Sequence, residues 1–353
     1  MTVTVRSFAK INLGLRIGAA REDGFHELVT VYQTIGLHDV IRVSVGRGSG
    51  IEIRCADPRV PRDESNTCFR IVEKALGVLK IKSRAVIEIE KRLPVQGGLG
   101  GASANAVAAL LGLERALKKS LPATERLRIA AEVGSDLPLF LVGGTVLGVG
   151  RGEQVYPLQD LPAMPCVVVT PGVGVSTPKA FAEWDRRMAV LAEKPAELRS
   201  ARTLRLRSGQ AHKSARPHTS FPHTSRDRII ELGRGLSAWL SETYSSAPSD
   251  LLTGRGRAEN PLLWLVRAGI ENDFEQVVFP EYPELSEGKR ALERAGAVYA
   301  SLSGSGSTLY GLFWSRAEAA KAVGRLRTAG WAARATVTLP RRAYWKKFLV
   351  SSV

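Results

Sequence analysis

Cysteine is scarce in this sequence, and its spacing excludes two common kinds of stabilisation. The 353 residues contain three cysteines, Cys55, Cys68 and Cys166, which are odd in number and far apart. No C-x-x-C spacing occurs, so neither a disulfide framework nor a zinc site is indicated. Such cysteine usage suits a reducing compartment, and we expect a cytoplasmic location.

Long apolar segments are also missing. The longest apolar run, residues 137–150, contains a proline and several glycines, and it is shorter than the ~20 residues that a membrane helix requires. Near the start, TVTVRSFAKINLGLRI alternates polar and apolar side chains, and Arg6 and Lys10 interrupt any apolar core of the signal-peptide kind. We therefore expect neither secretion nor contact with a membrane.

Acidic residues are outnumbered, which raises the question of a polyanionic partner. The formal net charge is +16, and an excess of this size is often a sign of nucleic-acid binding. Much of the excess is concentrated in residues 194–228, which hold nine Lys or Arg against two acids, repeat PHTS and lack packing periodicity. We interpret this stretch as a disordered basic insert without a nucleic-acid partner; the alternative is a nucleic-acid or membrane contact.

Strand-like and helix-like segments alternate through the rest of the chain, which is long enough for two domains. The first half therefore reads as α/β or α+β, and the pattern restarts with CVVVTP after residue 165, which places a domain boundary near residue 160. The predicted strands are 3–17, 29–35, 40–45, 51–54 and 85–90. The predicted helices are 66–80, 102–118, 124–133, 178–192 and one near 229–243, followed by a helix–strand–strand–helix–strand run over 284–338.

Glycine, in contrast, is concentrated in one short stretch, LPVQGGLGGASANA at residues 93–106. Four glycines in five positions stand between a predicted strand and a predicted helix, where backbone N–H groups and the helix dipole favour an anion. The missing Cβ atoms let a phosphate approach the backbone, although a tight turn with close helix–sheet packing is the alternative. The Walker pattern and the protein-kinase motifs are missing, and the dinucleotide-binding fingerprint is matched only in part. The remaining interpretation is an ATP site of a different type.

This stretch resembles the second motif of the GHMP kinases, P-x-x-x-G-L-G-S-S-A. Two further stretches, SFAKINLGLRIGAAREDGFHELVTVYQTI at 7–35 and GSDLPLFLVGG at 134–144, are similar to the 4-diphosphocytidyl-2-C-methyl-D-erythritol kinases within that group. PGVGVSTPKAF, ENDFE and SLSGSGSTLYGLF continue the resemblance in the same order, so that it covers the whole chain except the insert.

The resemblance implies an α+β fold of two domains and a kinase activity. The implied domains are a ribosomal-protein-S5-domain-2-like N-terminal domain over 1–160 and a ferredoxin-like C-terminal domain over 161–353. The implied reaction is ATP-dependent phosphorylation of the 2-hydroxyl of 4-diphosphocytidyl-2-C-methyl-D-erythritol in the non-mevalonate isoprenoid pathway. ATP and Mg²⁺ are the implied cofactors, the partners are small molecules, and the sequence identifies no magnesium ligand.

The catalytic residues implied by the resemblance are Lys10 and Asp136. A carboxylate beside an alcohol can accept its proton during attack on the γ-phosphoryl group, and a lysine can orient the carboxylate and offset developing charge. Asn12 lies two residues beyond Lys10, hence on the same strand face, and could hold the substrate diol. Read alone, Asp136 would be a helix cap or turn residue, and Lys10 a lysine at a strand edge.

The resemblance also implies two sets of binding residues. The matching ATP residues are Asn66, Lys91, Pro94, Gly97, Gly98, Leu99, Gly100, Gly101, Ala102, Ser103 and Asn105. The matching substrate residues are Asn12, Phe25, His26, Tyr32, Phe181, Gly304, Ser305 and Gly306. In this set an imidazole can read the cytosine edge while aromatic faces stack on the base, although each aromatic alone would be more typical of a core.

Three features depart from the family pattern. Ala104 replaces the second serine of the motif, Phe25 stands where tyrosine is common, and the insert at 194–228 is foreign to the family. Two other functions stay open at this point. Another GHMP kinase, such as homoserine kinase, would share the ATP loop without requiring the Phe25–His26 turn. A basic RNA-binding protein with an S5-like domain would need neither Lys10 nor Asp136.

Overall fold

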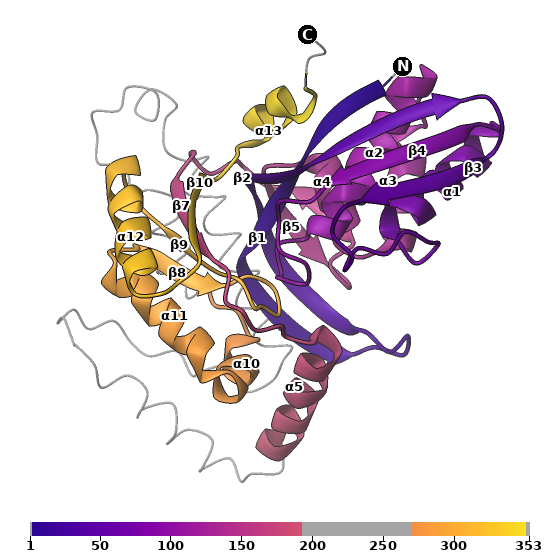
Figure 1. The fold of residues 1–353 in the computed structure, drawn as a ribbon. Coiled ribbons are helices and arrows are strands. Elements are labelled where there is room, and N and C mark those ends of the chain that lie inside the picture. The colour runs from indigo at the N-terminus through magenta and orange to yellow at the C-terminus, as the bar shows by residue number, and fades with distance from the viewer. Residues whose placement is uncertain (1, 193–269, 351–353) are drawn as a thin grey trace, which may run out of the picture.

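The computed structural model describes residues 2–192 and 270–350, which form two lobes joined by shared strands and packing (Figure 1). The basic insert at 194–228 and the helix expected near 229–243 lie outside the described residues. Within the described part, no helix is long and apolar enough to cross a membrane. The three cysteines are buried and free.

The first lobe is built on two long antiparallel strands, β1 (Thr2–Ala20) and β2 (His26–Gly46). The sheet continues in the order β3-β4-β2-β5-β6, and β1 pairs with β2 outside that path. The other strands are β3 (Gly50–Cys55), β4 (Arg84–Glu90), β5 (Thr145–Val149) and β6 (Gln154–Pro157). Strands β5 and β6 were not predicted from the sequence.

The predicted strands 29–35 and 40–45 are one continuous strand in the structure. Residues 36–39 read as a break because they begin with glycine, yet Thr34 pairs with Lys10 and His38 pairs with Phe8 across a register shift in β1. A Cβ atom on Gly36 would lie 3.1 Å from the hydroxyl of Thr336. The glycine thus permits a close approach of the second lobe instead of a turn.

Four helices cover one face of the first sheet: α1 (Thr67–Leu79), α2 (Gly101–Leu117), α3 (Ala123–Val133) and α4 (Leu137–Val142) (Figure 1). Their apolar faces pack with the inward residues of β2 and β4 in one core, which contains Ile71, Val107 and Ile87. Helix α4 was not predicted, because six residues that are almost all apolar show no helical period.

The second lobe has an antiparallel sheet in the order β10-β7-β9-β8, with helices packed against it. The run predicted over 284–338 corresponds to α11, β8, β9, α12 and β10 in the structure. The strands are β7 (Pro165–Val169), β8 (Tyr299–Leu302), β9 (Leu309–Leu312) and β10 (Ala333–Val337). The helices are α5 (Thr177–Ala192), α10 (Glu275–Glu281), α11 (Pro283–Arg294) and α12 (Arg316–Thr328).

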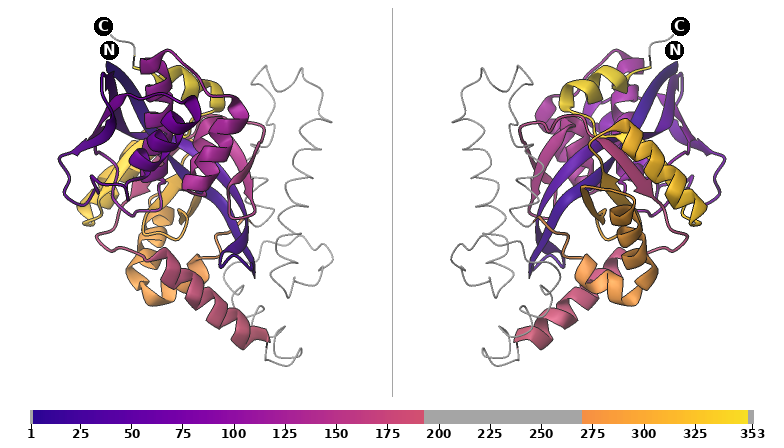
Figure 2. Two further views of the ribbon diagram at one scale, coloured as in Figure 1. Left: turned by 90° about the vertical axis from the view of Figure 1, so that its right-hand side faces the viewer. Right: turned by 90° about the vertical axis from the view of Figure 1, so that its left-hand side faces the viewer.

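The chain then returns to the first lobe. Helix α13 (Arg341–Phe348) follows β10, and its residues Tyr344 and Phe348 are buried in the same core as α1 and α2. A separate apolar cluster lies between the lobes and joins Ile11 and Leu13 of β1 to Tyr310 and Leu312 of β9. Figure 2 shows β1 and β2 running alongside both lobes. This arrangement places residues 10–14 where the two lobes meet.

Three fully buried tyrosines predict how the protein responds to alkali. Burial raises the pKa of Tyr32, Tyr310 and Tyr344 above the ordinary value of about 10, because the phenolate would be desolvated. Above that pH the unfolded chain loses these protons and the folded chain keeps them, so the free energy of unfolding falls as pH rises. We expect phenolate absorbance of these three residues to appear only together with loss of tertiary circular dichroism. Reversible ionisation of all seven tyrosines in the folded state would contradict this.

Candidate active site

The glycine loop packs against a second glycine-rich turn from the other lobe. Gly98 has a φ of +74°, and a Cβ atom there would lie 2.1 Å from the carbonyl oxygen of Ser303. The Ser303 hydroxyl donates to the Gly98 carbonyl at 2.9 Å, and the Thr308 N–H donates to the Gly97 carbonyl at 3.2 Å. Close approach of backbone to backbone therefore explains Gly98, independently of any bound phosphate.

The same loop also opens helix α2 in a form suited to an anion. Gly100 is the N-cap, with a φ of 68° and no side-chain cap. The first N–H groups of an α-helix have no acceptor within the helix, and here they belong to Gly101, Ala102 and Ser103. A Cβ atom on Gly100 would lie 3.0 Å from the Lys10 side chain. The positive end of α2 and the Lys10 side chain are therefore neighbours.

Lys10 and Asp136 form an ion pair between β1 and the start of α4. The Lys10 Nζ lies 3.3 Å from Asp136 Oδ2, and the exposed fractions of the two side chains are 4% and 32%. The ammonium also donates to Asn12 Oδ1 at 2.7 Å. Asn12 in turn donates to the Thr30 hydroxyl at 2.8 Å. The amide of Asn12 is thus already engaged in holding Lys10.

Tyr32 belongs to this polar cluster and not to the group of aromatic rings around His26. Its hydroxyl donates to Asp136 Oδ1 at 3.0 Å, and the Lys10 ammonium lies 5.6 Å from the centre of its ring. In the described part of the chain, no ring contact joins Tyr32 to His26 or Phe181. The structure therefore separates Tyr32 from the other aromatic residues predicted for the cytidine pocket.

His26 and Phe181 do come together, at the far end of the β1–β2 pair. Their rings are stacked, with centroids 4.7 Å apart and an angle of 14°. His26 Nε2 lies 2.7 Å from Asp185 Oδ1 on α5, and because a carboxylate only accepts, this nitrogen carries the proton. The Phe25 ring is exposed, and the Arg151 guanidinium lies 4.8 Å from its centre. Sequence analysis missed Asp185, because no local pattern links residues 26 and 185.

Two of the three residues predicted near the purine, Lys91 and Asn105, contact a buried carboxylate that was not predicted from the sequence. Asp39 is fully buried and accepts from Lys91 Nζ at 2.7 Å and from Asn105 Nδ2 at 3.0 Å. The Oδ1 atom of Asn105 is buried without a hydrogen-bond partner. Asn66 is further engaged in capping α1, where its side chain accepts from the Cys68 N–H. Pro94 lies at the start of the glycine loop, against Gly97.

The third glycine-rich segment, residues 303–307, closes over the ion pair. A Cβ atom on Gly304 would lie 3.4 Å from Lys10 Nζ. Asn272 holds the segment by donating to the carbonyls of Leu302 and Gly304, at 2.8 and 2.7 Å. The Ser305 hydroxyl is 2.8 Å from the Thr177 hydroxyl at the start of α5. Gly306 lies in the same turn, which brings the predicted Gly304, Ser305 and Gly306 to the first lobe.

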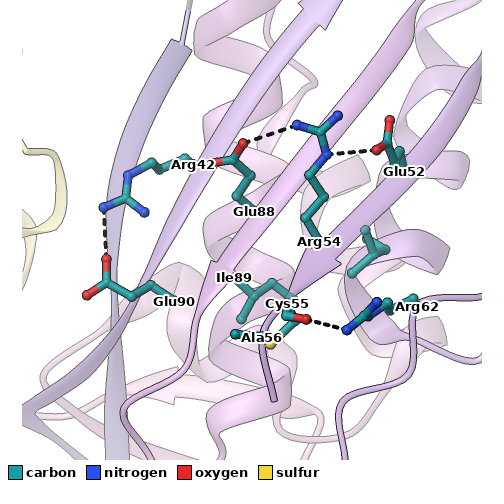
Figure 3. A pocket seen from close by; sticks show the side chains of 10 residues that line it. Arg42, Glu52, Arg54, Cys55, Ala56, Arg62, Glu88, Ile89 and Glu90 are labelled. Atoms are coloured by element: carbon teal, nitrogen blue, oxygen red, sulfur yellow. Dashed lines mark hydrogen bonds and ion pairs between the residues drawn. The ribbon is translucent and has the colours of Figure 1, made fainter. Parts of the chain in front are cut away.

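A hollow lies elsewhere, on the outer face of β2, β3 and β4, and none of the predicted site residues lines it (Figure 3). Arg42 pairs with Glu90 at 2.8 Å, and Arg54 pairs with Glu52 at 2.7 Å. The first pair joins two neighbouring strands and the second lies within β3, so the charged side chains that line the hollow are satisfied by surface ion pairs. Within residues 2–192 and 270–350 no group of three His, Cys, Asp or Glu could hold a metal ion.

Comparison with known proteins defines the class of this site. The GHMP kinases N terminal domain matches residues 66–144, and the GHMP kinases C terminal domain matches residues 262–332. A homoserine kinase from Cytophaga hutchinsonii shares the fold, with a TM-score of 0.64 at 19% identity and coverage of 96% of this chain and 95% of that one. The two lobes and the glycine loop between them are therefore those of a GHMP kinase.

More similar relatives narrow the class. A protein from Solibacter usitatus named 4-diphosphocytidyl-2-C-methyl-D-erythritol kinase is 35% identical over 312 residues, which cover 88% of this chain and 81% of that protein. A Geobacter sulfurreducens protein of the same name is 30% identical and covers 96% and 99%. A crystal structure of 4-(cytidine 5'-diphospho)-2C-methyl-D-erythritol kinase matches with a TM-score of 0.64 at 26% identity, over 95% and 98% of the two chains.

The chain belongs to the 4-diphosphocytidyl-2-C-methyl-D-erythritol kinase family. The resemblance found in the sequence and the predicted α+β GHMP kinase fold are both confirmed.

Packing of the two glycine-rich segments predicts the effect of a methyl group on Gly98. The Gly98→Ala variant would place Cβ inside the Ser303 carbonyl at a φ that L-residues avoid. We expect the free energy of unfolding to fall by about 2 kcal/mol or more, because strain and overpacking each cost roughly 1–3 kcal/mol. Chemical denaturation measures it.

A matched control is Gly77→Ala in helix α1, where an added Cβ would meet nothing within 4 Å. Alanine should stabilise that position by about 0.5–1 kcal/mol, since glycine is unfavourable inside a helix. A Gly98→Ala protein as stable as the wild type would show that the two segments are not held in this packing.

Proposed function

We propose that this protein transfers the γ-phosphoryl group of ATP to the 2-hydroxyl of 4-diphosphocytidyl-2-C-methyl-D-erythritol, a step in isoprenoid precursor synthesis. The observation that carries the proposal is the Lys10–Asp136 ion pair, set beside the positive end of helix α2. The names of relatives that match nearly the whole chain supply the substrate.

The ion pair supplies the two groups that are required when an alcohol attacks a phosphoryl group: a base and a cation. Asp136 is the more exposed partner and can accept the hydroxyl proton as the new O–P bond forms. The bond from the γ-phosphorus to the bridging oxygen breaks, and ADP leaves with that oxygen. Lys10 orients the carboxylate and offsets negative charge on the phosphoryl oxygens.

Two buried polar atoms without hydrogen-bond partners support binding of ATP beside the glycine loop. Asn105 Oδ1 and Thr308 Oγ1 are buried and lack hydrogen-bond partners, and both adjoin the glycine loop or the start of α2. We assign the triphosphate to the N–H groups of residues 97–103 and the purine to the neighbourhood of Asn66, Lys91 and Asn105.

Magnesium would arrive with ATP, because this ion is usually held by phosphates, water and only one or two protein oxygens. The Ser103 hydroxyl at the start of α2 is such an oxygen. When bound, the ion would neutralise phosphate charge.

The cytidine end of the substrate would lie at His26 and Phe181. Because Nε2 donates its N–H to Asp185, the Nδ1 atom of a neutral His26 is an acceptor, and it has no hydrogen bond to the described residues. An acceptor suits the exocyclic amine of cytosine and does not suit the O4 carbonyl of uracil.

Other functions are less favoured. The homoserine kinase shares the fold at 19% identity, whereas the cytidyl kinase relative from Solibacter usitatus is 35% identical. We propose that the partners are two small molecules, ATP and the cytidine substrate, without nucleic acid or membrane, and that the enzyme works in the cytoplasm.

The catalytic assignment predicts that Asp136→Asn and Lys10→Ala each lower kcat by about two orders of magnitude or more, since a positioned base contributes ~10²–10⁴-fold. ATP should still bind, because positioning of the nucleotide does not require the base. If the two residues act as a unit, the double variant should be scarcely slower than the slower single variant. Steady-state kinetics and ATP titration measure both effects.

Lys74→Ala serves as the control, since Lys74 is an exposed lysine paired with Glu132 on the helical face. It should keep wild-type kcat. An Asp136→Asn enzyme that retains more than about a tenth of the wild-type kcat would exclude Asp136 as the base.

Recognition of cytosine predicts discrimination against a uridine diphosphate analogue of the substrate. Each polar group left unpaired should cost ~1–3 kcal/mol in kcat/KM. Asp185→Ala should narrow the difference in kcat/KM between the cytidine substrate and its uridine analogue, because the imidazole could then donate from Nδ1. Glu183→Ala, a change on the same helix, should leave that difference unchanged. Equal kcat/KM for both analogues in the wild type would remove His26 from this role.

A further inference from the structure

The Tyr32 side chain is closely packed, and its hydroxyl has one hydrogen-bond acceptor among the described residues. Its side chain is 2% exposed and lies on β2, opposite Asn12 of β1. The hydroxyl donates to Asp136 Oδ1 at 3.0 Å, and Tyr32 makes no other hydrogen bond through its side chain within the described residues. A buried phenol requires a partner, and here that partner is the carboxylate proposed to accept the substrate proton.

Two glycines of the neighbouring strand and turn make room for the ring. A Cβ atom on Gly148 would lie 2.5 Å from Tyr32 Cε2, and one on Gly152 would lie 2.4 Å from its hydroxyl. Gly152 also has a φ of +98°, where a side chain would be strained. The backbone around β5 is thus adapted to a phenol at this position, and not merely to a space of any shape.

The Asp136 carboxylate is held from two sides by different chemistry. Oδ2 faces the Lys10 ammonium at 3.3 Å, and Oδ1 accepts the neutral Tyr32 hydroxyl. Burial, followed by the nearby Asp136 charge, raises the pKa of Tyr32 well above its ordinary value, so that it stays a donor. Glu153 also raises the pKa of Tyr32, and its carboxylate accepts from the Arg151 N–H; the Lys10 ammonium lies 5.6 Å from the centre of the Tyr32 ring.

We propose that Tyr32 is a positioning residue for the reaction, which orients the Asp136 carboxylate through its hydroxyl and presents the free lone pairs to the acceptor alcohol. The inference rests on the proposed function, because it assigns Tyr32 a part in the same phosphoryl transfer. Lys10 alone leaves the carboxylate free to turn about its Cβ–Cγ bond, and the second contact, on the other oxygen, fixes that rotation. Small errors in the placement of a reacting group cost large factors in rate.

The alternative is that Tyr32 is a core aromatic whose hydroxyl has no part in the reaction. A variant that keeps the ring and lacks the hydroxyl distinguishes the two cases. Tyr32→Phe keeps the ring and its packing and removes only the donor. We expect kcat to fall by about tenfold, because the carboxylate loses the contact that fixes its rotation and is misplaced for the reaction. KM for ATP and for the cytidine substrate should stay within about twofold.

Tyr344→Phe is the matched control. Tyr344 is equally buried, and its hydroxyl donates to the Phe140 carbonyl at 2.8 Å instead of to a site carboxylate. It should lose stability to a similar degree in a thermal melt and keep wild-type kcat. Wild-type kcat in Tyr32→Phe, or a fall in kcat as large in Tyr344→Phe, would overturn the proposal.

A double-variant cycle separates action through Asp136 from a general disturbance. In an Asp136→Asn background, Tyr32→Phe should lower kcat by less than about twofold, because the group that it positions is already disabled. A further tenfold loss in that background would overturn the proposal. Failure of the proposed function is distinguishable, since the wild type itself would then fail to phosphorylate the cytidine substrate.

Discussion

The ammonium group of Lys10 is almost completely buried, and the arrangement around it follows from the need to pair that charge. A buried cation is tolerated only with good acceptors. Asn12 supplies an amide oxygen, Asp136 supplies a carboxylate, and the Tyr32 ring face lies beside them. These groups come from β1, the start of α4 and β2, so three elements must be held in place for one charge to be stable.

The buried Lys10 side chain also needs space, which two glycines provide. Gly100 of the glycine loop and Gly304 of the opposite turn both face the lysine, and a Cβ atom on each would lie 3.0 Å from its Cγ and 3.4 Å from its Nζ, respectively. The turn belongs to the second lobe, and the cluster of Ile11, Leu13, Tyr310 and Leu312 fixes that lobe against β1. Apolar packing between the lobes therefore sets the geometry of a polar site.

Elements with a clear period were predicted from the sequence, and elements without one were not. The predicted helix at 102–118 corresponds to α2 within a residue at either end, because its small and apolar residues repeat at helical spacing. Helix α4 is too short for such a signal, and β2 was divided at Gly36, whose role is close approach to β10. In the site, the glycine loop was predicted from a local pattern of residues. Asp39 and Asp185 were not predicted, because their partners Lys91 and His26 are distant in the sequence.

By itself, the sequence determined the glycine loop, the main periodic segments and the family, since each depends on residues that are neighbours in the chain. Only the tertiary structure decided that Tyr32 faces Asp136 and lies apart from His26 and Phe181. That outcome depends on the β1–β2 register and on the space left by Gly148 and Gly152. Such contacts join residues more than a hundred positions apart, and they form only when the strands and helices of the first lobe are packed together.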